Sequence, residues 1–87
     1  MKPVVYILET SVGKYYIGST DNLKRRLEQH KTGHTHSTKR MGKIKLIFSQ
    51  VYESLIDARS VELKLKKLKR KDYLEKIIKE GYIKIVP

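Results

Sequence analysis

The sequence predicts an α+β fold in which a small β-sheet is flanked by helices. Side chains that favour strands, β-branched and aromatic, are concentrated in residues 4–8, 15–17 and 44–52. Apolar side chains recur three or four positions apart, as in helices that bury one face, in residues 23–30, 55–68 and 74–78. Because a chain of 87 residues can bury one modest core, residues 1–87 are expected to form a single domain.

The first two predicted strands form a hairpin. Residues 4–8 are almost continuously apolar, which is typical of a strand covered on both faces. Ser11 and Gly13 favour a turn that brings residues 15–17 back as an antiparallel neighbour.

Later segments extend this sheet. Residues 44–52 place Ile44, Leu46 and Phe48 at alternate positions, which predicts a third strand. Residues 82–86 alternate weakly, in the manner of an edge strand. Residues 31–43 are polar and basic and hold two glycines, so they are expected to form an exposed, mobile loop.

Three helices are predicted from capping residues and apolar spacing. Residues 18–22 supply N-caps for a helix that continues to about His30. Ser54 can cap a long second helix, and Asp72 can cap a shorter last helix that Gly81 stops. The apolar faces of these two helices consist of Leu55, Ala58, Val61, Leu65 and Leu68, and of Leu74, Ile77 and Ile78.

The charge balance indicates a polyanionic partner. Twenty Lys and Arg residues against nine Asp and Glu residues give a net charge of +11, so nucleic acid is the expected ligand. The longest apolar run, residues 4–8, is too short to span a membrane or to serve as a secretory signal. The absence of cysteine fits a protein of the cytoplasm, which is the expected location.

Several side chains are candidates for chemistry. Arg26 and His30 are four residues apart and project from one side of the first helix, although a basic surface helix would show the same spacing. Glu62 lies at the edge of an apolar stripe and therefore needs a partner, either a structural Lys or Arg or a divalent cation. Tyr6 and Tyr16 are core tyrosines, or else phenols that nearby positive charge activates.

The loop and the later basic run offer alternatives. His30, His34 and His36 could form a zinc cluster. Thr38, Lys39 and Arg40 make the same loop a better candidate for phosphate contacts. Residues 64–71 contain six basic side chains, which form either a solvated helical face or a track for a nucleic-acid backbone.

Taken in order, these residues resemble the GIY-YIG nuclease domain over essentially the whole chain. The matching segments are Val4-Val5-Tyr6, Tyr16-Ile17-Gly18, Asn22 to Leu27 with His30, and Ala58 followed by Glu62. The resemblance is greatest to small stand-alone members related to the amino-terminal nuclease module of the bacterial excision-repair incision subunit. It implies a three-stranded antiparallel sheet and a DNA endonuclease that nicks one strand with a single Mg²⁺ or Mn²⁺, in DNA repair or processing.

The resemblance also implies a role for each site residue. Tyr16 is similar to the general base, and Tyr6 to the tyrosine that hydrogen-bonds within the site. Arg26 would neutralise charge on the scissile phosphate, His30 would assist proton transfer or orient the water, and Glu62 would hold the metal.

The chain departs from the family pattern at several positions. Val4 and Val5 replace Gly-Ile, Ser19 stands where repair nucleases have Lys, Lys43 replaces a frequent Pro, and a late Asn is missing. Lys14 or Lys24 could take the place of that lysine as a cation near Tyr16. The basic and hydroxyl side chains expected to contact nucleic acid are Lys14, Lys24, Arg25, Thr38, Lys39 and Arg40.

Two functions remain open at this point. One is the metal-dependent DNA endonuclease, with RNA left open as a substrate. The other is a basic nucleic-acid-binding module on the same fold that cuts slowly or not at all. Because so small a domain can read only a short site, strong sequence specificity would require a partner protein or a dimer.

Overall fold

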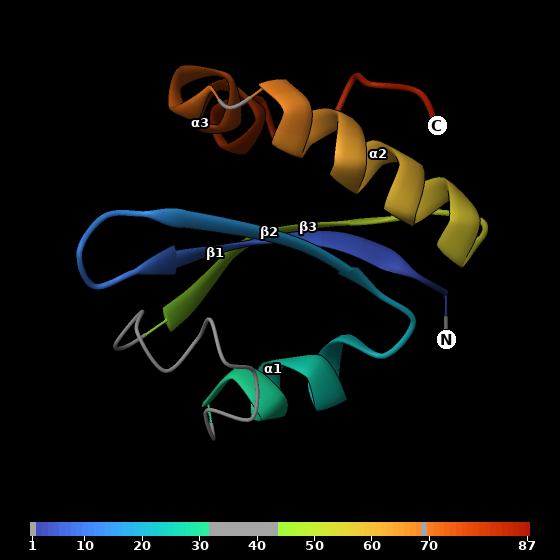
Figure 1. Cartoon of the computed structure of the whole chain (residues 1–87), viewed down its shortest axis with the longest axis horizontal. Coiled ribbons are helices and arrows are strands. Elements are labelled where there is room, and N and C mark those ends of the chain that lie inside the picture. Colours follow the sequence, from blue (N-terminus) through green and yellow to red (C-terminus); the bar gives the residue numbers. More distant parts are fainter. Residues whose placement is uncertain (1, 32–43, 69) are drawn as a thin grey trace.

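The computed structural model describes residues 2–31, 44–68 and 70–87, which form three strands and three helices (Figure 1). In chain order the elements are β1 (Val4–Thr10), β2 (Tyr15–Thr20), α1 (Leu23–Lys31), β3 (Ile44–Val51), α2 (Leu55–Leu68) and α3 (Lys71–Glu80). The predicted loop over residues 32–43 lies outside the described residues.

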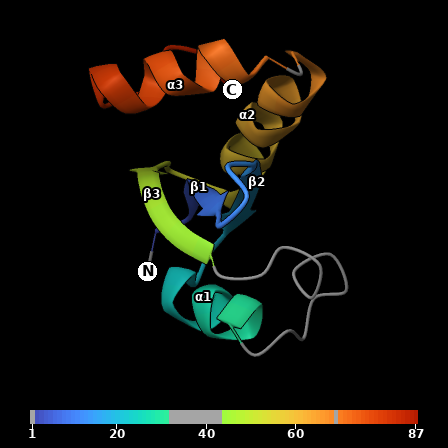
Figure 2. The same cartoon turned by 90° about the vertical axis from the view of Figure 1, so that its left-hand side faces the viewer.

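The strands form an antiparallel sheet in the order β2-β1-β3. Helix α1 covers one face, and α2 and α3 cover the other, so the molecule has three layers (Figures 1 and 2). The predicted α+β fold, with a three-stranded antiparallel sheet flanked by helices, is therefore confirmed. The central strand β1 is buried on both faces, as its continuous apolar run predicts.

Alternate side chains of β1 belong to two separate hydrophobic clusters. Val5 and Ile7 pack with the apolar stripes of α2 and α3. Val4, Tyr6 and Leu8 face α1 and pack against its two leucines. Because successive side chains of a strand point to opposite faces, one short apolar segment builds both layers of the core.

A β-bulge in β3 changes the faces that its sequence predicts. Ile44 and Leu46 pack on the α1 side, but Phe48 packs on the α2 side together with Ile47. The register with β1 shifts between Ile7 and Leu8, because one extra residue of β3 lies opposite that step. Alternate spacing therefore predicted the strand correctly but not the face that Phe48 occupies.

The helix ends are mostly those that the capping residues predict. Asn22 Oδ1 accepts from the Arg25 backbone N–H at 3.1 Å, and Ser54 Oγ accepts from the Asp57 backbone N–H at 3.1 Å. Gly81 ends α3 in the left-handed conformation, with φ of 86°, which glycine adopts without strain.

Two expectations for the last two helices are wrong. Arg70, not Asp72, is the N-cap residue of α3, and Asp72 instead binds the Arg70 guanidinium at 2.8 Å within the first turn. Leu68, the last residue of the α2 stripe, is 43% exposed, because the helix ends there beyond the area that the sheet covers.

The predicted edge strand over residues 82–86 is also wrong. This tail has no strand structure, yet its alternation is real, because Ile83 is buried whereas Tyr82 is exposed. The Gln50 side chain replaces a strand partner: its Oε1 accepts from the Ile83 N–H at 2.6 Å and its Nε2 donates to the Ile83 carbonyl at 3.5 Å. A side-chain amide can satisfy the backbone hydrogen-bonding groups of one residue, but not those of a whole strand.

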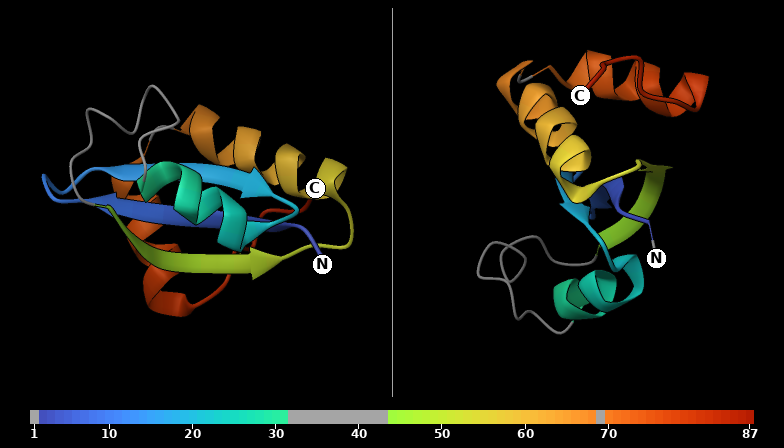
Figure 3. Two further views of the ribbon diagram at one scale, coloured as in Figure 1. Left: turned by 90° about the horizontal axis from the view of Figure 1, so that it is seen from below. Right: turned by 90° about the vertical axis from the view of Figure 1, so that its right-hand side faces the viewer.

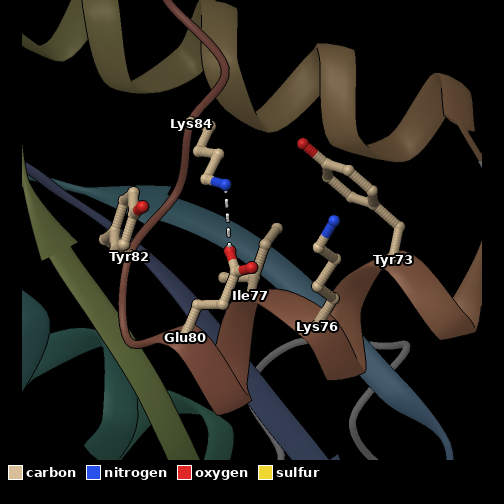
Figure 4. A pocket seen from close by; sticks show the side chains of 6 residues that line it. All are labelled: Tyr73, Lys76, Ile77, Glu80, Tyr82 and Lys84. Carbon is tan, nitrogen blue, oxygen red and sulfur yellow. Dashed lines mark ion pairs between the residues drawn. The ribbon is translucent and has the colours of Figure 1, made fainter.

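The tail folds back beside α3 and leaves a small pocket between them (Figure 4). Lys84 Nζ lies 3.6 Å from Glu80 Oε2 and above the Tyr82 ring, 5.7 Å from its centroid. The pocket encloses about 20 Å³, which is room for about one water molecule. It is therefore too small to hold a substrate.

Candidate active site at the edge of the sheet

Tyr6 lies completely buried beneath α1 and opposite Gly18 on the neighbouring strand. A Cβ atom at position 18 would lie 2.5 Å from Tyr6 Cζ and closer still to its hydroxyl. Only glycine leaves room for the phenol there, so the glycine of the second motif and the tyrosine of the first form one structural unit.

Arg26 joins this unit from α1. Its Nε donates to the Tyr6 hydroxyl at 3.4 Å, and its Nη1 donates to Gln29 Oε1 at 3.5 Å. The hydrogen bond to Tyr6 raises the pKa of Arg26, whose guanidinium also interacts with the Tyr16 hydroxyl. Arg26 is therefore held as a fixed positive charge between the two phenols.

The environments of the two tyrosines differ. Burial raises the pKa of Tyr6 and outweighs the opposing effect of the Arg26 hydrogen bond and charge, and Tyr16 and Glu62 make smaller contributions in the raising direction. Tyr6 is therefore a neutral phenol at physiological pH. Tyr16 lies on the same face of the sheet but is only half-buried, so it is the phenol that a substrate can approach.

Glu62 reaches the sheet edge from α2, on the opposite face. Its Oε1 accepts a short hydrogen bond from Ser19 Oγ of β2, and its Oε2 lies 2.6 Å from Lys66 Nζ one helical turn later. The same lysine ammonium lies over the Tyr16 ring, 5.9 Å from its centroid. Lys66 therefore links Glu62 to Tyr16, around the edge of the sheet.

The edge strand allows groups from both faces to meet. Strand β2 is an edge strand, and α2 runs along it on the side opposite α1 (Figure 3). Side chains of α2 can therefore reach past β2 toward the α1 layer. Helix α2 runs against the direction of β2: Glu62 contacts Ser19, and Lys66, farther along the helix, contacts Tyr16, which is earlier in the strand.

A cleft of about 240 Å³ opens beside Arg26, between α1 and the start of α2. It is lined mainly by polar groups, and three arginines contribute to it: Arg25, Arg26 and Arg59. Arg25 also lies 3.9 Å from Asp21, one turn earlier, so part of its charge is paired. The cleft is electropositive and large enough for a phosphate group and part of its sugar.

The structure thus brings together most of the predicted site. Tyr6, Tyr16 and Arg26 are in contact, and Glu62 is close enough for its charge to act on Tyr6. His30 lies in the last turn of α1, but its side chain is outside the described part of the chain.

The residues expected to contact nucleic acid are dispersed. Arg25 lines the cleft beside Arg26, whereas Lys24 is exposed elsewhere on α1. Lys14 lines a different cleft, with Arg70 and Lys71. The remaining candidates from the loop lie outside the described residues: Thr38, Lys39, Arg40, His34 and His36.

Sequence reasoning missed three residues of the site: Ser19, Arg59 and Lys66. The latter two lie three residues before and four residues after Glu62, so they share a helical face with it, and this spacing could have identified them. Ser19 occupies the position of the family's lysine, and the lysine that lies beside Tyr16 is Lys66, whereas Lys14 lines a different cleft. In the basic run, Lys64 also has an internal partner, since it donates to the Val86 carbonyl at 2.8 Å.

The described residues restrict the kind of metal site. Within residues 2–31, 44–68 and 70–87, no group of three or more His, Asp or Glu side chains is placed to hold a metal ion. A single carboxylate remains compatible with Mg²⁺ or Mn²⁺, because such cations keep several water ligands. Glu62 is the residue predicted from the sequence to hold the metal, and both of its carboxylate oxygens lie at the sheet edge, against Ser19 and Lys66. Among the same residues, no helix is long and apolar enough to cross a membrane.

The fold and this arrangement of tyrosines, arginine and glutamate define a class of protein. The GIY-YIG catalytic domain family matches residues 2–77, so the chain belongs to that family, which is a family of nucleases.

More particular relatives carry the name UPF0213. The chain is 40% identical over 70 residues to a UPF0213 protein of Streptococcus pneumoniae serotype 4, covering 79% of this chain and 71% of the relative. It is 35% identical over 74 residues to UPF0213 protein CPE1444 of Clostridium perfringens, covering 84% and 80%. The solution NMR structure of UPF0213 protein BH0048 from Bacillus halodurans superposes with a TM-score of 0.59 and 29% identity, over 93% of this chain and 87% of that one.

Proposed function

We propose that this protein is a metal-dependent DNA endonuclease that nicks one strand at a time, in DNA repair or processing. The observation that carries the proposal is the contact between Arg26 and Tyr6 beside Tyr16, with the Glu62 carboxylate close enough to act on Tyr6. A nuclease needs a base, a fixed positive charge and a metal ligand at one place, and these residues supply them.

The different environments of the two tyrosines support different roles for them. Tyr16 is half-buried, with the cations of Arg26 and Lys66 beside it, and its deprotonated oxygen is the proposed acceptor for the proton of the attacking water. Tyr6 is buried and neutral, so it serves as a hydrogen-bonding group that orients Arg26. His30 is assigned to proton transfer or to orienting the water, from its position in α1.

Arg26 and the cleft beside it hold the substrate. Its guanidinium neutralises charge that develops on the scissile phosphate, because it is already fixed by Tyr6 and Gln29. Arg59 and Arg25 face the same cleft and would contact neighbouring phosphates. Glu62 would hold one Mg²⁺ or Mn²⁺, which when bound stabilises charge on the leaving oxygen.

One observation favours the second candidate, a nucleic-acid-binding module without catalysis. Ser19 and Lys66 already satisfy the Glu62 carboxylate, as they would if its role were structural. In that case the arginine cleft would bind phosphate, and the protein would bind nucleic acid with a steep salt dependence but would not cut it.

A cleavage panel distinguishes the two candidates. The purified chain is incubated with Mg²⁺ or Mn²⁺ and supercoiled, flap, branched, damaged and single-stranded DNA, and nicks are counted. We expect Glu62→Gln and Arg26→Ala to lose at least about 100-fold in rate, and Tyr16→Phe to lose a similar amount, with unchanged circular dichroism spectra.

Glu53→Gln is the matched control, because this carboxylate is 84% exposed and pairs with Lys2 away from the site. It should cut like the unmodified chain. Equal residual cutting by the unmodified protein and the Glu62→Gln variant would indicate a contaminating nuclease. Salt-sensitive binding without any cutting would establish the binding module instead.

A further inference from the structure

Lys66 occupies the carboxylate that a metal would use. Its ammonium lies 2.6 Å from Glu62 Oε2, and the Glu62 side chain is only 16% exposed. Hard divalent cations also bind to carboxylate oxygens, and because Ser19 already donates to Oε1, a metal ion on Glu62 would compete with the ammonium for Oε2. Two cations on one oxygen repel each other, and this repulsion is large where solvent is partly excluded.

Lys66 also prevents an electrostatic penalty in the metal-free protein. A carboxylate that is mostly buried and has no cationic partner is costly, and the Ser19 hydroxyl supplies one hydrogen bond but no charge. The lysine thus offsets the charge of the Glu62 carboxylate.

We infer, on the basis of the proposed function, that a divalent cation binds Glu62 by exchange: it displaces the Lys66 ammonium, while Ser19 keeps the carboxylate in position. The two partners of Glu62 differ in how freely they can move, as this exchange requires. Ser19 is fixed in β2, whereas Lys66 is 47% exposed and has a flexible four-carbon stem. Lys66 is a positioning residue that competes with the metal.

The displaced ammonium remains beside the substrate. Lys66 already lies over the Tyr16 ring, so leaving Glu62 does not require it to leave the site. Its charge, paired until then, becomes available to the phosphate and to the Tyr16 phenol. The exchange therefore supplies the cation that the family pattern places at position 19, where this chain has Ser19.

A Mn²⁺ titration without DNA tests the exchange independently of cleavage. Free Mn²⁺ is measured by electron paramagnetic resonance for the unmodified chain and for Lys66→Met, Lys66→Arg and Lys67→Met. Lys67→Met is the matched control, since Lys67 is exposed in the same helical turn and its loss changes the net charge equally. Thermal unfolding is recorded with and without Mn²⁺.

We expect Lys66→Met to bind Mn²⁺ about two- to fivefold more tightly than Lys67→Met, because partly exposed ion pairs have about that strength. Lys66→Arg retains the ion pair and should resemble the unmodified chain. Without metal, Lys66→Met should unfold at a lower temperature, and Mn²⁺ should stabilise it more than it stabilises the unmodified chain.

Equal or weaker Mn²⁺ binding by Lys66→Met, relative to Lys67→Met, would overturn the exchange. A Glu62→Gln variant separates this failure from failure of the proposed function. If Glu62→Gln abolishes binding while Lys66→Met leaves it unchanged, the metal site stands and the exchange is wrong. If Glu62→Gln binds Mn²⁺ normally, or if no variant binds it, both proposals are wrong.

Discussion

Replacing Gly18 by alanine tests whether Tyr6 and Gly18 form one unit. The added Cβ would lie 2.5 Å from Tyr6 Cζ, and ordinary contact begins at 3.4 Å, so 3.4 Å minus 2.5 Å leaves at least 0.9 Å of displacement. Tyr6 is completely buried, and the ring can move only by disturbing the cluster beneath α1. Overpacking of this kind costs about 1–3 kcal/mol, which lowers the unfolding midpoint of a domain of this size by about 5–20 °C.

The sign of the stability change in Gly18→Ala shows whether the added Cβ atom clashes with Tyr6. Without the clash, alanine would stabilise the strand by about 0.5–1 kcal/mol, because glycine loses more conformational entropy on folding. Thermal and urea unfolding are compared in the unmodified chain and in a Tyr6→Leu background, where removal of the ring should abolish most of the penalty. A Gly18→Ala variant as stable as the unmodified chain would refute the reasoning.

The close approach also connects stability to the site. The Arg26 Nε to Tyr6 hydroxyl contact is already 3.4 Å long, so a displacement of 0.9 Å away from Arg26 would break it. We therefore expect Gly18→Ala to lose activity even at temperatures at which it remains folded. Activity measured well below the unfolding midpoint separates this effect from unfolding.

Two further predictions concern the tail and the pH dependence of stability. Gln50→Ala removes both hydrogen bonds to Ile83 and should cost about 1–3 kcal/mol in urea unfolding, whereas Lys45→Ala, at an exposed position of the same strand, should change stability little. Because burial raises the pKa of Tyr6 above its ordinary value of 10.0, the unfolded chain loses this proton first. The contribution of Tyr6 to the free energy of unfolding should be constant below that value and fall as pH rises above it. Tyr6→Phe should reduce this fall. Guanidinium unfolding measured from about pH 8 to about pH 11 would show the difference.

Local signals made most of the fold predictable. Asn22 and Ser54 cap their helices through side chains that act within three residues, so the sequence around them contains the necessary information. The continuous apolar run of β1 likewise predicted a buried central strand. At the tail and in β3, where prediction failed, a distant contact decided: Gln50 holds Ile83 without a strand, and the bulge opposite β1 turns Phe48 to the other face.

The composition of the site was also largely predictable, because Tyr6, Tyr16, Arg26 and Glu62 stand in a recognisable order along the chain. By itself, the sequence determined the three strands of the sheet, the three helices, the net charge of +11 and the family. Only the tertiary structure decided which groups meet across the sheet edge, namely Lys66 with both Glu62 and Tyr16. The physical reason is range: periodicity and caps act over a few residues, whereas these contacts depend on how a helix from one face passes an edge strand.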